Sequence, residues 1–386
     1  MTRLQAIFAI LALALIRILR PVVTFRFGAL FVSRLGHLAG NTECYLCEKD
    51  AGINRPKRVI DIWCPIGKPA NEQLLKMFKR VIHVSRLAEI VIASGQRWDW
   101  FKRDHSFNDS QWGRDIHNLM EKSPPHLAFT KAEETRGKRG LAMLGMPEDA
   151  KWVCIAARDS MFLKMTEPWN DYSYHDFRNS SIQNYREAAV ALMDRGYWVL
   201  RMGQHVEEPM KLQAPKFIDY ARHPLSCDFM DVYLGAKCAF TISNGLGFDG
   251  IPMIFRRPIC FVNEAPFEYL STWMPNSLAI WKHHHGAAGN RLSPDRIIEA
   301  KAGLFHSSQQ YKDAGITLME NTPAEIISVA QEMADRLEGK IPTILDDRQS
   351  EFWKAFPRSN SPHNGRPLHG EIRLRIGSKF LESYEN

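Results

Sequence analysis

The 386-residue sequence contains no hydrophobic run long enough to cross a bilayer. Its longest apolar stretch, Ala6 to Ile16, covers eleven residues, whereas a membrane-spanning helix needs about 20. No small-x-small cleavage signal follows that stretch, so it does not resemble a removable signal peptide. The sequence also has no internal repeat and no low-complexity tract. With 45% hydrophobic and 24% charged residues, it is an ordinary globular chain.

The sequence also lacks a disulfide framework. The seven cysteines are an odd number, and Cys154, Cys238 and Cys260 lie inside apolar runs, which favours a reducing compartment. Cys44 and Cys47 form one C-x-x-C pair, and no second pair accompanies it. A single pair of this kind is typical of two neighbours on a helix; metal or redox use is the alternative.

Positive charge is concentrated at the beginning of the chain. The net charge is +7, and five arginines precede the first acidic residue, Glu43. The rest of the chain is nearly balanced, which argues against a broad nucleic-acid-binding face and predicts no nucleic-acid partner. The five arginines are Arg3, Arg17, Arg20, Arg26 and Arg34.

Residues 1–24 are predicted to form an uncleaved, membrane-associated helix. The apolar run is followed by Arg17 and Arg20, which would meet anionic head groups while the apolar face enters the leaflet. We therefore expect residues 1–23 to contact the cytoplasmic membrane surface, with the protein peripheral on the inner face of the plasma membrane. The alternative is an ordinary helix packed on the adjoining domain.

The remaining sequence alternates between β-prone runs and helical segments. Such alternation predicts an α/β protein with parallel, doubly wound sheets. We expect two Rossmann-like domains, 25–147 on the acceptor side and 148–345 on the nucleotide side, facing a cleft. Residues 346–386 are rich in proline, asparagine and charge, and are predicted to be a mostly irregular tail.

Residues 238–262 contain the most informative motif. A β-prone run, Cys238 to Ile242, ends in Ser243-Asn244-Gly245-Leu246-Gly247, and an apolar segment follows. Small residues between a strand and a helix let backbone N–H groups face an anion, most often phosphate. A plain tight turn is the alternative. The predicted diphosphate ligands here are Ser243, Asn244, Gly245 and Gly247.

Other polar clusters follow neighbouring predicted strands. In open α/β sheets, ligands bind beyond the carboxyl ends of the strands. Arg158, Arg201 and Gly203 are predicted to bind a diphosphate, the two arginines by bidentate hydrogen bonds. Asn263 and Glu264 are predicted to accept from ribose or sugar hydroxyls. The alternative for each arginine is a structural ion pair with a carboxylate.

Two apparent motifs are not interpreted as binding sites. Gly245-x-Gly247-x-x-Gly250 matches the dinucleotide fingerprint, with Glu264 near the expected acidic position. Pro252, however, falls inside the helix that this motif requires, and the next strand follows too soon for a full crossover helix. The tract 283–285 is three histidines, but adjacent residues rarely converge on one ion, so no metal site is predicted.

A second cluster follows the first predicted strand, Phe25 to Val32. Here His37 is a candidate general base toward a sugar hydroxyl, because the pKa of histidine lies near 7. Asp159 is the alternative catalytic residue, and Glu264 is another candidate base. A helix-capping or merely polar role is the alternative for His37. The predicted acceptor-side residues are Arg34, Gly36, Asn41 and Glu43.

The chain resembles a family of bacterial glycosyltransferases associated with surface-polysaccharide loci. The resemblance is carried by RLGHLAGNTE (34–43), RNSSIQNYREAA (178–189) and AFTISNGLGFDGIPMIFRRPICFVN (239–263), within 26–52, 178–203 and 228–263, and by 293–305 and 316–326. It implies a GT-B-like fold with the donor in the carboxyl-terminal domain and no bound metal, in keeping with the lack of a convincing D-x-D site. Arg257 and Asn244 depart from the looser GT-B pattern, in which a small residue and serine are common.

These observations predict a metal-independent glycosyltransferase of the hexosyltransferase type. It would move a sugar from a nucleotide-sugar, acting as substrate rather than cofactor, to a glycan or lipid-linked acceptor. A nucleotide-sugar epimerase of the same fold is one alternative, and it would need acid/base carboxylates at the donor site. A non-catalytic carbohydrate- or partner-binding protein is the other.

Overall fold

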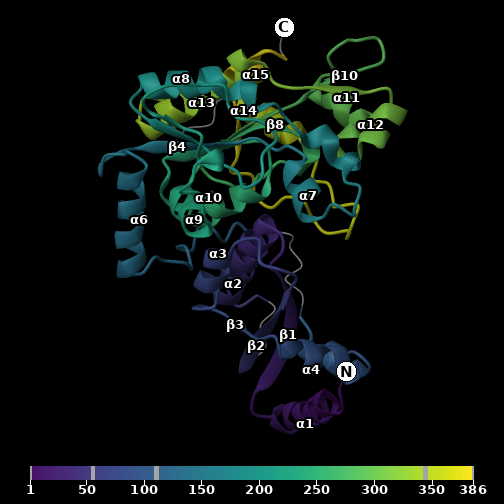
Figure 1. Ribbon diagram of the computed structural model, residues 1–386. Helices are drawn as coiled ribbons and strands as arrows, with labels where there is room; N and C mark the ends of the chain where they lie inside the picture. Colours follow the sequence, from purple (N-terminus) through teal and green to yellow (C-terminus); the bar gives the residue numbers. More distant parts are fainter. Residues whose placement is uncertain (1, 54–56, 108–112, 342–346, 385–386) are drawn as a thin grey trace.

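The computed structural model describes residues 2–53, 57–107, 113–341 and 347–384. Two α/β units are stacked end to end, with the smaller, amino-terminal unit projecting below the larger one (Figure 1). The smaller unit contains a three-stranded sheet and the larger a seven-stranded sheet. Both sheets are parallel throughout the described residues. This confirms the predicted α/β fold with two parallel-sheet units.

The smaller sheet has the order β1-β2-β3. Alternate residues of β2 face opposite sides, since Trp63 packs in one hydrophobic cluster while Ile62 and Cys64 pack in another. Helices therefore cover both faces, as expected of a buried parallel sheet. Its elements are β1 (Thr24–Phe31), β2 (Val59–Ile66), β3 (His83–Val84), η1 (His37–Asn41, a π-helix), α2 (Thr42–Asp50), α3 (Glu72–Phe78), α4 (Ala88–Gly95) and α5 (Asp99–His105).

The first helix, α1 (Arg3–Leu19), lies across the far end of the smaller unit (Figure 1). Thr2 begins it with a capping box that involves Gln5. Ala9 and Ile16 are buried, and Ile16 packs in a cluster with Ala88 and Val91 of α4. Among the described residues, no helix combines the length and apolar character needed to cross a bilayer.

The larger sheet has the order β12-β9-β8-β7-β4-β5-β6. On β4, Val153 and Ile155 pack in the cluster that contains α8 and α13, whereas Cys154 and Ala156 pack in the cluster that contains α9 and α10. The sheet is therefore doubly wound. The strands and main helices are β4 (Trp152–Ala156), β5 (Trp198–Arg201), β6 (Phe217–Ile218), β7 (Phe240–Ser243), β8 (Ile259–Glu264), β9 (Leu278–Trp281), β12 (Arg375–Ile376), α8 (Arg186–Asp194), α9 (Asp228–Lys237), α10 (Gly250–Ile254) and α13 (Pro323–Leu337).

Shorter elements connect the strands of the larger unit. The pair β10–β11 is antiparallel and stands apart from the main sheet. The remaining elements up to residue 341 are α7 (Met161–Thr166), η2 (Ser173–Arg178), η3 (Ile182–Tyr185), η4 (Tyr220–Arg222), η5 (Gly247–Asp249), η6 (Phe267–Tyr269), β10 (His283–His285), α11 (Pro294–Glu299), η7 (Ala302–Leu304), α12 (Ser308–Asp313) and β11 (Thr317–Met319).

One hydrophobic cluster continues from the smaller unit into the larger. It joins Leu30 and Leu38 of the smaller unit to Phe248 and Ile251 of the larger. The two units therefore share buried apolar surface instead of meeting only through a linker. This packing fixes the loop after β1 against the turn after β7.

The sequence-based boundaries differ from the structure in two places. Helix α6 (Lys131–Met143) precedes the expected boundary at 147 but packs against α9 of the larger unit, where Gly137 lies against the Tyr233 ring. The tail after 345 is more ordered than expected, because it contains α14 (Asp347–Ala355), β12 and α15 (Ser378–Glu382). β12 extends the sheet by pairing with β9.

Candidate active site

Glycines bring the two units into direct contact. A Cβ on Gly36 would lie 3.3 Å from the Gly247 Cα atom, and one on Gly250 would lie 2.8 Å from the Ala39 Cβ atom. Only a residue without a side chain permits backbones to approach this closely. The Arg34–Glu43 segment after β1 and the Ser243–Gly247 turn after β7 therefore face each other at the junction.

Three arginines gather beside this junction. Arg34 reaches across from the smaller unit, where its Nη2 atom lies 3.0 Å from Glu167 Oε1 and donates to the Tyr172 hydroxyl at 3.1 Å. Arg158 follows β4 and Arg178 ends η2. Arg178 Nη2 donates to the Gly245 carbonyl oxygen at 2.5 Å.

The arginines create a positive field that the protein does not neutralise fully. Burial, followed by Arg158, Arg178 and Arg34, lowers the pKa of His175 to about 4. Burial and then Arg178 lower the pKa of Arg158 to about 10. Arg158 Nη1 and Arg178 Nε are buried without a hydrogen-bond partner, and neither arginine forms an ion pair within the described residues. Unused guanidinium donors of this kind suit a phosphate or diphosphate.

The Asn244 side chain organises the turn after β7. Its Oδ1 atom accepts from the Arg158 backbone N–H at 2.7 Å, and its Nδ2 atom donates to the Arg178 carbonyl oxygen at 2.8 Å. Serine has no separate acceptor and donor at this reach, which explains the departure noted in the sequence. Gly245 has a φ of 74°, the left-handed region that glycine tolerates. The buried Ser243 hydroxyl lies beside the Asp249 carboxyl group, whose pKa it lowers, and forms no other hydrogen bond among the described residues.

Two buried carboxyl groups border the same turn. Burial raises the pKa of Glu264 to about 8, with Asp249 adding to the shift and Arg178 and Arg114 opposing it. Burial likewise raises the pKa of Asp249 to about 7. Glu264 Oε1 has no hydrogen-bond partner in the described chain, and a Cβ on Gly245 would lie only 2.8 Å from it. Glu264 is therefore mainly protonated near neutral pH and available as a hydrogen-bond donor.

His37 begins η1 on the opposite side of the junction. Burial lowers its pKa below the usual 6.5; Arg34 lowers it further, while the Asn41 side chain raises it. The Phe31 ring lies beside it, with the two centroids 6.4 Å apart. The imidazole is consequently neutral at pH 7, the form that a general base requires.

A separate pocket of about 750 Å³ opens at the carboxyl edge of the larger sheet. Asp159 organises its wall, because its two oxygens accept from the backbone N–H groups of Met161 and Glu207, each at 2.9 Å. The wall is mainly acidic and polar, so it suits hydroxyl and amino groups better than phosphate. Its lining residues are Ala157, Asp159, Asp176, Phe177, Asn179, Ser180, Ser181, Ile182, Glu207, Glu208, Lys282, Leu318 and Glu320.

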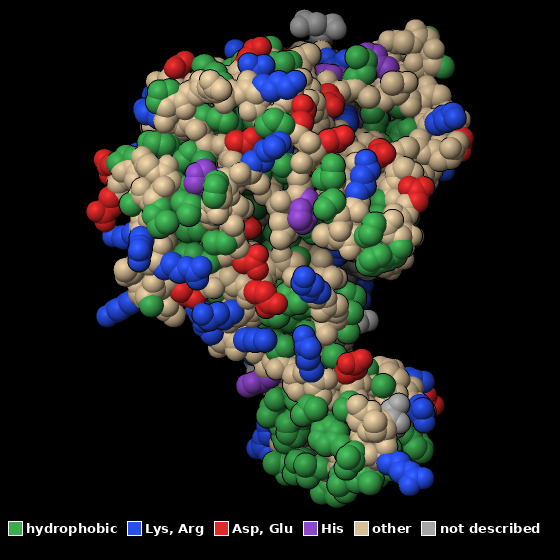
Figure 2. Space-filling view, viewed as in Figure 1, with side chains coloured by type: hydrophobic (Ala, Val, Ile, Leu, Met, Phe, Trp, Pro, Cys, Tyr) green, Lys and Arg blue, Asp and Glu red, His purple; other side chains and the backbone are tan. Residues whose placement is uncertain are grey.

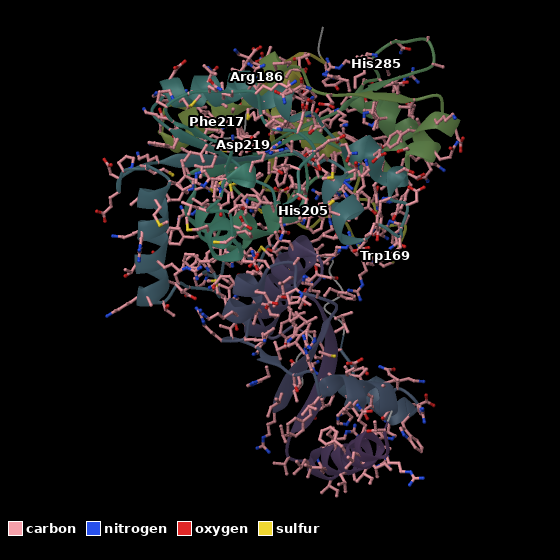
Figure 3. The ribbon with its side chains drawn as sticks, viewed as in Figure 1. Trp169, Arg186, His205, Phe217, Asp219 and His285 are labelled. Carbon is pink, nitrogen blue, oxygen red and sulfur yellow. The ribbon has the colours of Figure 1, made fainter. Side chains whose placement is uncertain are left out.

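Arg201 and Asn263 are held within the protein instead of facing the junction. Arg201 is 1% exposed, and its Nη1 atom lies 3.2 Å from Asp219 Oδ1, directly after β6 (Figure 3). Asn263 exchanges hydrogen bonds with Asn321: each backbone N–H donates to the other residue's side-chain oxygen, at 2.6 and 2.5 Å. This geometry favours structural roles for both. Gly203, with a φ of 148°, lies in the loop after Arg201.

Glu43 and Asn41 are buried beneath the junction. Glu43 Oε1 lies 2.6 Å from Arg256 Nη2 and 3.0 Å from His126 Nδ1. Glu43, Cys47 and His126 are close enough to hold a metal ion, but the Arg256 guanidinium supplies the positive charge there. Cys44 and Cys47 are both buried on α2, as a helical pair. In the histidine tract, His283 contacts Glu325 whereas His284 contacts the Lys282 carbonyl group, so these two rings do not converge.

Sequence reasoning missed Arg178, His175 and Asp249. The first two belong to a short helical segment that follows no strand, so no strand end marked them. The signal available was Arg178 at the start of the resembling stretch 178–189. Asp249 lies in the resembling stretch 239–263, but no residue pattern marked it as a site residue.

No family model matches the sequence, and no curated protein matches it. Solved structures with similar folds include a glycosyl transferase family 9 protein from Veillonella parvula (10% identity, 81% of this chain, 97% of that chain, TM-score 0.47). They also include E. coli ADP-heptose lps heptosyltransferase II (12% identity, 81% of this chain, 100% of that chain, TM-score 0.46). A third is UDP-GlcNAc 2-epimerase from Neisseria meningitidis (9% identity, 82% of this chain, 100% of that chain, TM-score 0.27). With TM-scores below 0.5, these similarities assign no activity, and the function must be argued from the site.

Proposed function

We propose that the protein is a metal-independent glycosyltransferase that moves a sugar from a nucleotide-sugar to a glycan or lipid-linked acceptor in surface-polysaccharide synthesis. The observation that carries this proposal is the arginine group Arg34, Arg158 and Arg178 at the junction of the two units, where Arg158 and Arg178 keep unpartnered guanidinium nitrogens and His37 begins η1 in the segment after β1. An anion site and a neutral histidine on opposite sides of one junction suit a donor diphosphate and an acceptor hydroxyl.

The donor diphosphate would lie against Arg158, Arg178 and the Ser243 hydroxyl. Unpartnered guanidinium donors there are already positioned, so they stabilise the charge that develops on the departing nucleoside diphosphate. Arginine in this role supplies the positive charge that a metal ion supplies in other transferases. The ribose and base would occupy the acidic pocket, where carboxylates such as Glu207 and Glu208 accept from hydroxyl or amino groups.

His37 would take the proton of the acceptor hydroxyl. The hydroxyl oxygen then forms a bond to the anomeric carbon of the donor sugar, while the bond from that carbon to the diphosphate oxygen breaks and its electrons leave with the nucleoside diphosphate. Protonated Glu264 would donate a hydrogen bond to the bound donor. Neutral His37 and protonated Glu264 are the forms that their shifted pKa values favour at pH 7.

The exposed apolar face of α1 would rest on the inner face of the plasma membrane. Leu4, Leu11 and Ile18 are 79, 64 and 73% exposed, and Arg3 and Arg17 lie beside them. Apolar contact together with basic side chains is the pattern of helices that lie in the interface of an anionic bilayer. The protein would thus be cytoplasmic and peripheral.

A nucleotide-sugar epimerase is the second candidate, and one observation favours it. Glu264 and Asp249 form the buried carboxyl pair beside the donor site that acid/base chemistry at the sugar itself would require. Product analysis separates the two activities, because an epimerase changes the sugar without releasing nucleoside diphosphate, whereas a transferase releases it in the presence of acceptor.

A thermal-shift panel of nucleoside diphosphates and nucleotide-sugars, including ADP and UDP forms, tests the donor site. We expect stabilisation by one base family in the wild type and its loss in Arg158→Ala. Arg186→Ala is the matched control, because Arg186 is exposed on the outer edge of the larger unit, far from the junction (Figure 3). A donor shift that survives in Arg158→Ala, or no shift with any nucleotide, would contradict the proposed site.

A further inference from the structure

The exposed side of α1 is a continuous apolar surface at the tip of the smaller unit. Figure 2 shows hydrophobic side chains covering this end of the molecule, with basic side chains around them. Arg17 and Arg20 belong to the same helix and to the turn that follows it. The side chains of this tip surface are Leu4, Ile7, Phe8, Ile10, Leu11, Leu15, Ile18 and Val22, all between 40 and 79% exposed.

This tip surface is rigidly attached to the small sheet. The opposite side of α1 is buried through Ala9 and Ile16, and Ile16 packs with Val91 of α4. Arg20 Nη2 lies 3.0 Å from Asp104 Oδ2, and the Arg17 guanidinium stacks on the Trp100 ring at 5.1 Å. Because α1 cannot swing independently, a bilayer against its exposed side has a fixed orientation relative to β1.

Strand β1 separates the tip surface from the candidate active site. It begins at Thr24, directly after the α1 turn, and leads upward to the junction (Figure 1). Its eight residues, at about 3.3 Å each, span roughly 25 Å. His37 follows the far end of the strand. The base would therefore stand well above the head groups of a membrane that α1 contacts.

Resting on the proposed transferase activity, we propose that the acceptor is the distal end of an extended, multi-sugar glycan carried by a membrane lipid. The enzyme would lengthen a glycan that already stands away from the bilayer, and would not add the first sugar to a lipid head group. A short head group does not reach His37 unless the lipid tail leaves the bilayer, which the hydrophobic effect opposes. The accepting hydroxyl gives its proton to His37 and bonds to the anomeric carbon, as described above.

The height of the site above the membrane can be measured without knowing the donor. Cys227 is exposed while the other cysteines are buried, so Cys227→Ser provides a background for single labels. One fluorophore is placed at Ala93→Cys on α4, beside the tip surface, and another at Lys164→Cys on α7, at the rim of the site; both positions are exposed. Vesicles of phosphatidylcholine and phosphatidylglycerol carry a lipid-linked acceptor dye.

We expect energy transfer to the lipid dye to be several-fold lower from residue 164 than from residue 93. Equal transfer from both positions would overturn the proposal, because the site would then lie at the bilayer surface. Failure of the chain to bind the vesicles would also overturn it. The proposal would likewise be overturned if the protein formed a dimer that buries the tip surface and therefore does not bind vesicles.

A spacer series tests the acceptor directly. An accepting glycoside is linked to a vesicle lipid through a short or a long poly(ethylene glycol) spacer, with the donor identified by the nucleotide panel. We expect at least tenfold faster transfer to the long form, and equal rates would contradict the proposal. The triple variant Leu4→Gln, Leu11→Gln, Ile18→Gln should lose transfer on vesicles but retain it on the free glycoside.

The matched control removes three exposed apolar side chains from the larger unit: Met143→Gln, Val190→Gln and Leu337→Gln. It should bind vesicles as the wild type does, and loss of vesicle binding in this control would contradict a specific role for the tip surface. If no nucleotide-sugar binds as donor, the proposed transferase activity is wrong, but the measured height of the site above the membrane still stands. If a donor binds and the site lies at the bilayer surface, only the proposal of an extended acceptor is wrong.

Discussion

Glu43 of the smaller unit lies 2.6 Å, Oε1 to Nη2, from Arg256 of the larger unit. Glu43 is completely buried, and the Arg256 side chain is 20% exposed. Arg256 also donates from Nε to the Met120 carbonyl oxygen at 2.8 Å, so its guanidinium is held on several sides. The residue predicted to face an acceptor instead ties together the two units whose junction forms the candidate site.

Loss of the Glu43 charge should destabilise the protein. Glu43→Gln leaves the Arg256 guanidinium partly buried without its carboxylate, and breaking a buried pair from one side typically costs about 3–5 kcal/mol. Thermal and urea unfolding measure this loss. Glu148→Gln is the control, because it removes an exposed pair with Lys138 and should not change stability measurably. Equal stability of Glu43→Gln and the wild type would contradict this role.

Stability should fall as pH rises through the range in which buried Glu264 ionises. The pKa of Glu264 is raised in the folded protein to about 8 from 4.5, so the folded state binds more protons than the unfolded state between these values. Its contribution is fully present below pH 4.5 and is lost as pH rises through about 8. In Glu264→Gln, the ligand-free protein should show a flatter decline of melting temperature over this range. An unchanged pH profile would mean that Glu264 is already ionised.

The Asn244 side chain should control donor affinity by holding two arginine-bearing segments. Asn244→Ser removes hydrogen bonds to the Arg158 N–H and the Arg178 carbonyl group, and each lost bond with a buried partner costs about 1–3 kcal/mol. We expect a lower melting temperature and donor binding weakened about tenfold, a difference of about 1.4 kcal/mol. Isothermal titration with the donor measures this effect. If affinity is unchanged while stability falls, Asn244 is a folding residue only.

Strand positions were predictable because they depend on neighbouring residues. The β-prone runs at 25–32 and 238–242 became β1 and β7. The turn after β7 was likewise visible in its serine, asparagine and glycine residues. In each case the residues that determine the structure lie within one turn or strand.

Features that depend on distant partners were not predictable. Arg201 was predicted to bind the diphosphate because it ends a strand. In the folded chain, its guanidinium instead forms an ion pair with Asp219, which follows a different strand. Arg178 is held at the site by a hydrogen bond to the Gly245 carbonyl oxygen, and the two residues come together only in the folded chain. Similarly, α6 precedes the boundary expected at 147, but Gly137 and Gly140 fit it against α9 of the larger unit.

His37 should affect the chemical step without affecting donor binding. His37→Gln keeps a polar side chain but removes the base, and loss of a general base typically lowers the rate about 10²–10⁴-fold. Because burial lowers the pKa of His37 below 6.5, the wild-type kcat/KM should rise with pH to a plateau that begins below the usual range of histidine. That acid limb should disappear in His37→Gln, while the donor-induced thermal shift remains. If His37→Gln has a normal kcat and an unchanged acid limb, His37 is not the base. Asp159 and Glu264 would then be tested as the base.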